Sequence, residues 1–492
     1  MSAVQSVDSV AMLPAYLAAG TAVLVLIVDL VLARPRATVA VAALGAFGTA
    51  VGAVVVGAGG ERRTFCVGAD CSWVFGGRAA VVAAVVALLT VGVLGLSVPA
   101  LGAGRSPVGE YAFLLACSMT GGVVLGAAGD LITLIVALET LTLPLYVLVG
   151  LRRGSLASAE AAVTFFVVSV VATTVSLLGA ALLYAVTGSL HLDRLGALLA
   201  ERPELRELPL TTAAVALLLL GLAFKVAAVP FHAWAPATYD GAPLPVAAYL
   251  STASKLGGLV ALLAVVQRAL PADQTGPVLA LLAVLTMTVG NLVALRQRRT
   301  VRLLAWSSVA QAGYILAPLG ALALAAGRTD EARTAAYAAA VAYAVFFVVL
   351  ELAAFAGVTA LRPASADGGT LDDLRGAARR HPWRGAALGL ALVGLAGLPP
   401  GLAGLFAKVT VVRSLLDGGA AWLALVVALN AVVGLAYYLR VTAALWAPTA
   451  TPGNAAPAVP VGGVVAAVLA VATVTAVVLG FAPQLVLDLA AR

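Results

Sequence analysis

The three lysines of this sequence all lie inside long apolar runs, where an amine has little water around it. Lys225 and Lys255 flank the stretch FKVAAVPFHAWAPATYDGAPLPVAAYLSTASK, in which Pro230 breaks any helix. Lys408 follows a second break, at Pro399–Pro400. A charged lysine at the centre of a bilayer costs about 2.5–3.5 kcal/mol, so its presence predicts a function. The chemistry that these amines offer at that depth is the binding and release of protons.

Two acidic residues also lie within apolar runs. Glu139 sits in VALETLTLPLYVL, one turn before Pro144. It is either close enough to an interface to reach water or the buried partner of a lysine. Burial disfavours the charged forms of both groups and pairing favours them, so a Glu–Lys pair can change its ionisation when a neighbouring charge appears. That property suits a proton pathway. Glu351, in VVLELAAF, is a further acid at membrane depth.

Other polar residues near these charges leave two interpretations open. His232, just past the first break, titrates near neutral pH and either relays protons or is a hydrogen-bonded structural histidine. A polar row in the tenth apolar run, which includes Ser307, Ser308, Gln311 and Tyr314, either holds a water chain or bonds to neighbouring helices.

The elements that must position these residues are membrane-spanning helices. The chain has 492 residues, of which 62% are hydrophobic and only 10% charged. Apolar runs long enough to cross a bilayer recur throughout. We predict an all-α polytopic membrane protein with about 14 spans, with approximate cores at 13–32, 37–56, 79–96, 111–128, 131–149, 161–186, 210–234, 243–267, 277–295, 303–324, 335–360, 386–415, 420–446 and 459–487.

The two proline breaks predict an internal duplication. A broken helix in a membrane survives only where protein or a water-filled cavity surrounds it, and paired broken helices are typical of transporters with inverted repeats. We expect helices 1–3 in residues 1–105, a first five-helix repeat (helices 4–8) in 106–270, a second inverted repeat (helices 9–13) in 271–447, and helix 14 in 448–492. In each repeat the fourth helix is broken.

Arginines predict the orientation. All 26 lie in loops or toward span ends, and the short loops that they favour include Arg34 and Arg36, and the cluster from Arg296 to Arg302. Such loops stay on the cytoplasmic side, which places both termini outside. Cys66 and Cys71 then share an outside loop, where they either form a disulfide or remain two unpaired small residues. The polar stretch from Thr187 to Leu208 predicts a short surface helix or ordered loop.

Several functions are excluded by what the sequence lacks. It has no Walker A loop and no GxGxxG between a strand and a helix, which argues against nucleotide binding. Three cysteines at these spacings are too few for an iron–sulfur cluster or a structural zinc. The net charge of +7 comes from scattered arginines and not from a basic patch, so we expect contact with the lipid bilayer and not with nucleic acid.

Five stretches together resemble the antiporter-like membrane subunits of respiratory complex I. Besides Phe224–Lys255, they are LETLTLPLYVLVGLRR, RTVRLLAWSSVAQAGY, LVGLAGLPPGLAGLFAK and VVGLAYYLR, and the similarity covers most of Gly122 to Leu445. The chain is most similar to the subunit N branch, because its eighth and twelfth spans carry lysines and it stops soon after span 14.

This resemblance implies roles for the buried charges. Glu139 and Lys225 would form a coupling pair, Lys255 the central relay and Lys408 the far-side exit, with His232, Glu351, Ser307 and Tyr314 as further relay candidates. It implies a bacterial inner-membrane protein that moves protons when quinone is reduced elsewhere in the complex. It also implies that NADH, FMN, iron–sulfur clusters and quinone are bound by other subunits, with no cofactor on this chain, and that its partners are neighbouring membrane-arm subunits.

The sequence departs from the family pattern at several positions. The sixth span has Thr164 where a lysine is usual, Ala237 replaces an aspartate, and Glu351 stands where a neutral polar residue is expected. Glu351 either offsets the missing lysine or pairs with another. The alternative function is a cation/proton antiporter subunit of a multi-subunit Na+/H+ antiporter. A scaffold whose charges only fix helix packing is a third interpretation.

Overall fold

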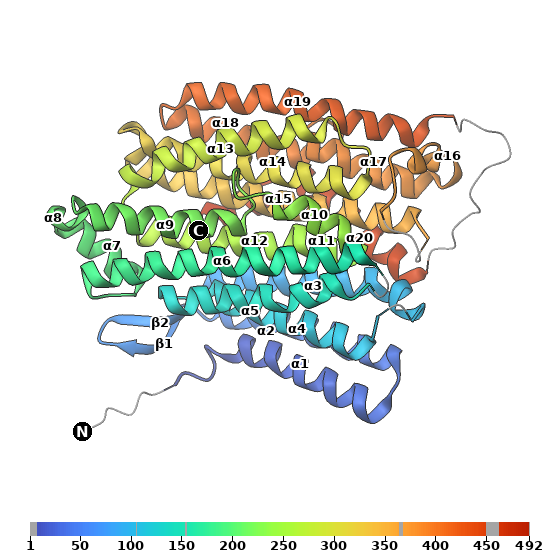
Figure 1. Ribbon diagram of the computed structural model, residues 1–492, viewed down its shortest axis with the longest axis horizontal. Helices are drawn as coiled ribbons and strands as arrows, with labels where there is room; N and C mark the ends of the chain where they lie inside the picture. Colours follow the sequence, from blue (N-terminus) through green and yellow to red (C-terminus); the bar gives the residue numbers. More distant parts are fainter. Residues whose placement is uncertain (1–6, 105, 153–154, 364–367, 449–461, 492) are drawn as a thin grey trace.

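The computed structural model describes residues 7–104, 106–152, 155–363, 368–448 and 462–491. Its helices run side by side in one bundle, with α1 at one edge and α19 at the other (Figure 1). The helices are α1 (Leu13–Leu32), α2 (Pro35–Ala58), α3 (Gly77–Gly102), α4 (Val108–Gly126), α5 (Leu131–Gly150), α6 (Leu156–Thr187), α7 (Leu192–Glu201), α8 (Pro203–Arg206), α9 (Pro209–Lys225), α10 (Trp234–Gly241), α11 (Leu244–Tyr249), α12 (Lys255–Arg268), α13 (Ala272–Ala294), α14 (Thr300–Gly320), α15 (Asp330–Leu361), α16 (Ala377–Arg380), α17 (Pro382–Ala396), α18 (Leu402–Asp417), α19 (Ala421–Trp446), α20 (Gly463–Phe481) and α21 (Gln484–Ala491).

Eleven helical segments in the described ranges are long and apolar enough to cross a membrane, and this chain is a multi-pass membrane protein. One of these segments joins α11 to α12 through the π-helical turn Leu250–Ser254. Two shorter apolar helices, α9 and α17, end at the two predicted breaks. The prediction was wrong at the last span, which ends at Phe481 and is followed by the separate helix α21.

The outward faces of the helices are apolar because the surrounding solvent is hydrocarbon. On α6, for example, Val163 and Val171 are 62% and 58% exposed, whereas Phe165 and Ser169 are buried. Charged residues are absent from the middle of this exposed face of α6, and its three serines, Ser158, Ser169 and Ser176, lie on the buried side. This arrangement is the reverse of a water-soluble bundle and directs polar chemistry to the interior.

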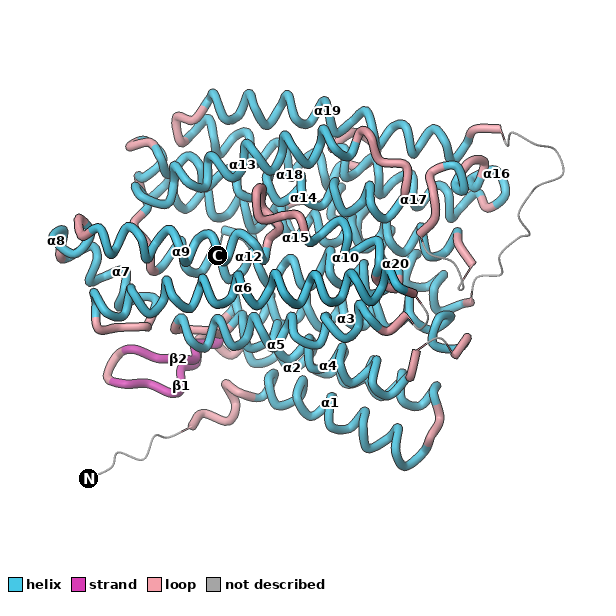
Figure 2. The backbone as a smooth tube through the Cα atoms, in the orientation of Figure 1, coloured by secondary structure: helices cyan, strands magenta, loops and turns pink. Residues whose placement is uncertain are grey.

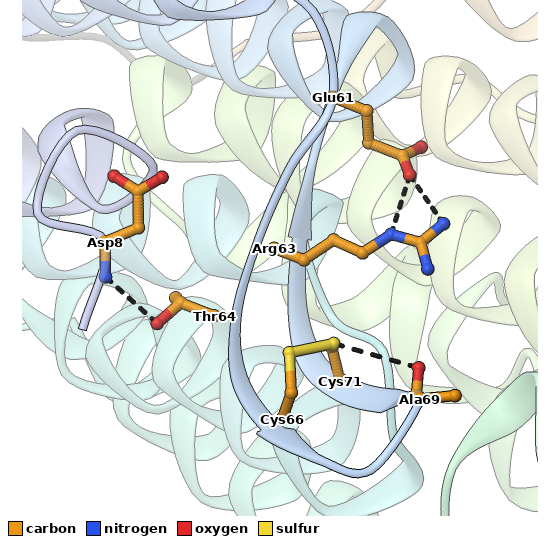
Figure 3. The surroundings of a disulfide bond; sticks show 7 residues. All are labelled: Asp8, Glu61, Arg63, Thr64, Cys66, Ala69 and Cys71. Atoms are coloured by element: carbon orange, nitrogen blue, oxygen red, sulfur yellow. Dashed lines mark hydrogen bonds and ion pairs between the residues drawn. A yellow bond between two sulfur atoms is a disulfide. The ribbon is translucent and has the colours of Figure 1, made fainter. Parts of the chain in front are cut away.

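A β-hairpin is the exception to the all-helical expectation. The loop that carries Cys66 and Cys71 forms the antiparallel strands β1 (Arg62–Val67) and β2 (Asp70–Phe75), which lie at the same end of the bundle as α7 and α8 (Figure 2). Cys66 and Cys71 are register partners and form a disulfide (Figure 3). The disulfide interpretation of these two cysteines is therefore the one that the structure contains.

The hairpin end of the bundle is fastened by backbone hydrogen bonds. Val74 N donates to Ala127 O at 2.9 Å and Gly129 N to Ser72 O at 2.9 Å, which joins β2 to the α4–α5 connection. From there, Leu131 N donates to Leu190 O at 3.0 Å, beside an isolated bridge between Asp130 and His191. The predicted surface helix in the stretch from Thr187 to Leu208 follows as α7.

Helix α7 covers the end of α12. It buries a row of leucines, Leu192, Leu195, Leu198 and Leu199. Its Asp193 accepts two hydrogen bonds from the Arg268 guanidinium, at 2.7 and 2.8 Å, and these bonds hold the pKa of the Asp193 carboxyl below its ordinary value. Since Arg268 is the last residue of α12, this pair anchors the helix that begins with Lys255.

Helix α6 packs closely on α9, which ends in Lys225. At Gly179 a Cβ atom would lie 2.6 Å from Leu218 N and 2.9 Å from Ala214 O. Both atoms belong to the α9 backbone, so they cannot move aside as a flexible side chain would. A glycine at this position therefore sets the distance between the two helices.

We predict that Gly179→Ala destabilises the protein by about 1–3 kcal/mol, the usual effect of overpacking. The measurement is thermal aggregation of the detergent-purified protein. Gly20→Ala in α1 is the matched control, because a Cβ there has no neighbour within 4 Å. Equal midpoints for the two variants would contradict the close α6–α9 contact.

Candidate functional site

Lys225 and Glu139 form a direct ion pair at the first break. Lys225 ends α9, and its Nζ donates to Glu139 Oε1 on α5 at 2.6 Å. The Lys225 side chain is 5% exposed and that of Glu139 is 18% exposed. Two charges in so little water need each other's field and further hydrogen bonds to offset their lost hydration. The buried-partner interpretation of Glu139 is thus the one found.

Hydroxyl groups complete the bonding of this pair. Ser169 Oγ on α6 accepts from Lys225 Nζ at 2.8 Å, and Thr142 Oγ1 accepts from it at 3.3 Å. Thr173 donates to Glu139 Oε1, and Tyr146 donates to Ser169 Oγ. The ammonium thus has three acceptors, which equals its number of N–H donors.

Lys255 lies in a second cluster between the two halves of the chain. Its Nζ donates to Ser308 Oγ on α14 at 2.6 Å and to Ser308 O at 2.7 Å. Ser251, one turn before Lys255, lies 3.1 Å from Ser308 Oγ and donates to Glu351 Oε1 on α15 at 2.7 Å. Glu351 has no exposed surface. The extra acid of the sequence therefore belongs with Lys255.

Lys408 occupies the second break without a carboxylate beside its amine in the described contacts. Its Nζ donates to Leu395 O at 3.3 Å and to Ala396 O, the last carbonyls of α17. Carbonyls at a helix C-terminus lack intrahelical partners and carry the negative end of the helix dipole, which favours a cation. The Tyr314 ring adds a cation–π contact, with Nζ 5.3 Å from its centroid.

Gly397 makes room for the Lys408 side chain. Its φ of +82° is a conformation that residues with a Cβ rarely adopt, and a Cβ there would lie 2.7 Å from Lys408 Cδ. The break at Pro399–Pro400 therefore does two things. It ends α17 so that its carbonyls are free, and it leaves space for the amine to reach them.

Polar residues connect the second and third clusters. Gln311 on α14 donates to Leu395 O at 3.1 Å, the same carbonyl that Lys408 contacts, and to Tyr438 OH at 3.0 Å. Tyr343 donates to Gln311 Oε1. Between the first and second clusters, Gly258 of α12 lies against the Lys225 backbone, where a Cβ would meet Lys225 O at 2.9 Å.

The other residues singled out in the sequence have varied positions. Tyr314 OH accepts from Asn291 Nδ2 at 3.0 Å, besides contacting Lys408 with its ring. Ser307 donates within its own helix, to Leu304 O at 2.7 Å.

The two remaining candidates, His232 and Thr164, lie on other elements. His232 is half-buried with its ring 5.0 Å from that of Trp306. Thr164 is half-buried on α6, one turn from Ala161, which contacts Gly241 of α10.

Sequence reasoning missed the hydroxyl residues that hold the charges. Ser169 and Thr173 are one turn apart on α6, and Thr142 and Tyr146 follow Glu139 at helical spacing. That spacing is the signal that could have identified them, but serine and threonine are common in membrane helices as partners of their own backbone. Among the described residues, no group of three His, Cys, Asp or Glu is placed to hold a metal ion.

Comparisons with known proteins identify the family of this chain. The family described as NADH:quinone oxidoreductase/Mrp antiporter, TM, matches residues 128–434, which include the three lysines, Glu139 and Glu351. A protein of Salinispora tropica named NADH-quinone oxidoreductase subunit N is 79% identical over the full length of both chains. This chain belongs to the subunit N family of NADH-quinone oxidoreductases.

Solved structures share the fold of this subunit N family member. A chain of respiratory complex I from Thermus thermophilus with bound Aureothin is 32% identical, with a TM-score of 0.79, and the match covers 97% of this chain and 99% of that one. A chain of the Mrp complex from Dietzia has a TM-score of 0.82 at 23% identity, covering 97% and 96% of the two chains. At that identity the second likeness shows the fold alone.

We predict that Ser169→Ala destabilises the protein by about 1–3 kcal/mol, because buried donors of Lys225 and Tyr146 lose their acceptor. Thermal aggregation in detergent measures this. The control is Thr174→Ala on the same helix, whose exposed hydroxyl bonds only to Val170 O. If both variants behave alike, Ser169 does not support the ion pair.

Proposed function

We propose that this chain is the proton-translocating subunit N in the membrane arm of a NADH:quinone oxidoreductase. The observation that carries the proposal is the buried Lys225–Glu139 pair, together with the two further buried amines of Lys255 and Lys408 in the same bundle. A scaffold would not need three amines, each placed at or just after a change in helical structure. The protein is one part of a translocating enzyme and moves protons, while electrons pass through other subunits.

Proton movement begins with a change of charge near Glu139. When Glu139 holds the Lys225 ammonium, at 2.6 Å, the proton on that amine is stabilised. If a neighbouring subunit draws the carboxylate away or neutralises it, the buried ammonium loses its counter-ion and releases its proton more easily. The proton passes toward Lys255 and then toward Lys408, which serves as the exit. His232, Ser307 and Tyr314 are further candidates for relay positions.

The partners and cofactors follow from membership of this family. We propose that neighbouring membrane-arm subunits contact the bundle, and that NADH, FMN, iron–sulfur clusters and quinone are bound elsewhere in the complex. The residues of this chain that touch the proposed pathway are amines, carboxylates, hydroxyls and amides, which exchange protons and do not carry electrons. The Mrp-type antiporter function is the second candidate, and the 79% identity to a subunit N favours the first.

The chain crosses the membrane fourteen times in this proposal. To the eleven long segments it adds α14 and the two broken helices, α9 with α10 and α17 with α18. The inner side carries the basic cluster from Arg296 to Arg302, and the disulfide hairpin lies outside with both termini. We assign it to the cytoplasmic membrane of a bacterium.

Matching contacts support two inverted repeats, in residues 106–270 and 271–447. A Cβ on Gly121 would lie 2.2 Å from Leu141 N, and one on Gly290 would lie 2.6 Å from Ala310 N, which makes α4–α5 and α13–α14 equivalent glycine contacts. Asp130, just before α5, bridges to His191 beyond α6. Arg299, just before α14, bridges to Thr370 beyond α15. The left-handed residues Ala227 and Gly397 each precede a break proline by three positions.

Removing either member of the ion pair should uncouple the enzyme. We predict that Lys225→Ala and Glu139→Ala, in the assembled complex, each lower proton pumping and NADH:quinone turnover on the order of a hundredfold, the lower range for a positioned proton-transfer group. Proton uptake by membrane vesicles and NADH oxidation measure the two activities. Arg194→Ala on the surface helix α7 is the control. Normal pumping in both variants would refute the proposal.

A cation at position 225 that cannot release its proton should also abolish proton pumping. Lys225→Arg retains a cation beside Glu139, but a guanidinium does not readily lose its proton. We predict an assembled complex in which pumping falls to near the Lys225→Ala level. The same vesicle assay measures it, and the amount of complex in the membrane serves as the control for folding. Pumping equal to that of the unmodified protein would mean that Lys225 acts only as a fixed charge.

A further inference from the structure

The equivalence of the two repeats gives Ser308 an unexpected position. The contact of Gly290 on α13 with Ala310 on α14 matches that of Gly121 on α4 with Leu141 on α5. Ser308 stands two residues before Ala310, and Glu139 stands two residues before Leu141, so the two have equivalent positions. Glu139 receives the Lys225 ammonium directly, and Ser308 receives the Lys255 ammonium, at 2.6 Å in both cases. A serine, however, cannot neutralise the lysine that it binds.

The missing negative charge is supplied from a different helix. Ser251 Oγ lies 3.1 Å from Ser308 Oγ and donates to Glu351 Oε1 on α15 at 2.7 Å. Neither serine nor Glu351 has any exposed surface, and Lys255 is 2% exposed. Two hydroxyls thus stand between a buried amine and a buried carboxylate, with no exposed atom among them in this part of the described structure.

The direction of each hydrogen bond follows from the donors available. An ionised carboxylate only accepts, so the single proton of Ser251 points to Glu351. The 3.1 Å contact with Ser308 Oγ is one in which Ser251 is the donor, while Ser308 Oγ accepts from the Lys255 ammonium. With the Ser251 proton on Glu351, Ser251 Oγ keeps free lone pairs, and a turn of the Ser308 hydroxyl toward it would align every bond from the cation toward the anion.

We propose that Ser308 and Ser251 form a hydroxyl wire that passes a proton from Lys255 to Glu351, and that Glu351 is the proton acceptor between the two halves of the pathway. This inference rests on the proposed function. The Lys255 ammonium gives a proton to Ser308 Oγ, the proton of Ser308 moves to Ser251 Oγ, and that of Ser251 moves to Glu351 Oε1. The products are a neutral amine and a neutral carboxylic acid, with both hydroxyls restored and their bonds reversed.

The geometry around Glu351 provides an onward direction. Glu351 Oε2 is buried and has no hydrogen-bond partner in the described part of the chain. Glu351 lies on α15, which packs against both the Leu250–Ser254 turn that precedes Lys255 and α18, the helix of Lys408. On the neighbouring α14, Gln311 donates to Tyr438 OH and to the same Leu395 carbonyl that Lys408 contacts.

The test uses Glu351→Gln and Ser251→Ala in the assembled complex. Glutamine keeps the size of the side chain without a titratable oxygen, and alanine interrupts the wire with little change in volume. We expect both to assemble and to lose proton pumping per complex. The control is Thr252→Val, which keeps the side-chain shape and removes a buried hydroxyl that bonds only to Ala248 O, outside the wire. It should pump normally.

A spectroscopic readout separates proton transfer from a structural role. Infrared difference spectra during turnover should show the carbonyl band of a protonated carboxyl that is missing in Glu351→Gln and diminished in Ser251→Ala. If both variants assemble less but pump normally per complex, or if the band persists in Glu351→Gln, the wire is refuted. Normal pumping in both variants, while Lys225→Ala and Lys255→Ala fail, would overturn the wire and leave the proposed function intact. Normal pumping in the two lysine variants would overturn the function itself.

Discussion

The structure depends on one constraint, which is that a charge inside a bilayer must be bonded by the protein itself. Each of the three lysines meets this constraint differently. Lys225 has a carboxylate and two hydroxyls, Lys255 has a serine that leads to Glu351, and Lys408 has the free carbonyls of a helix end. These three solutions differ in the kind of partner that the amine has, and a full negative charge stabilises an ammonium more than neutral dipoles do.

The breaks in the helices are part of the same solution. A continuous helix uses its own carbonyls, and only an interrupted one presents them to a side chain. At the second break, α17 ends so that Leu395 and Ala396 can bind the amine of Lys408. At the first break, α9 ends with Lys225 itself, which turns toward α5 and α6. The close contacts at Gly179 and Gly258 fix the helices to which these amines belong.

The two repeats that we propose would explain why similar parts of the chain do different work. Residues 106–270 and 271–447 share a glycine contact between neighbouring helices and an isolated bridge just before α5 and α14. Within this frame the position of Glu139 in one repeat is occupied by Ser308 in the other. The carboxylate of Glu351 on α15 lies two hydroxyl groups away from Lys255, through Ser308 and Ser251. Glu351, which stands where the family pattern has a neutral polar residue, is thus linked to Lys255 through Ser251 and Ser308.

The sequence by itself determined that the chain consists of membrane-crossing helices, where two of them break and which residues bear charge, because a bilayer permits few structures and makes each buried lysine conspicuous. It also suggested that Glu139 pairs with an amine. Only the tertiary structure decided that Glu351 belongs with Lys255, that Lys408 binds carbonyls, and that Ser169 and Thr173 hold the first pair. The sequence likewise did not predict that the loop with Cys66 and Cys71 forms a β-hairpin. The physical reason is that hydroxyls and carbonyls occur in every helix, and their use depends on which helices pack together.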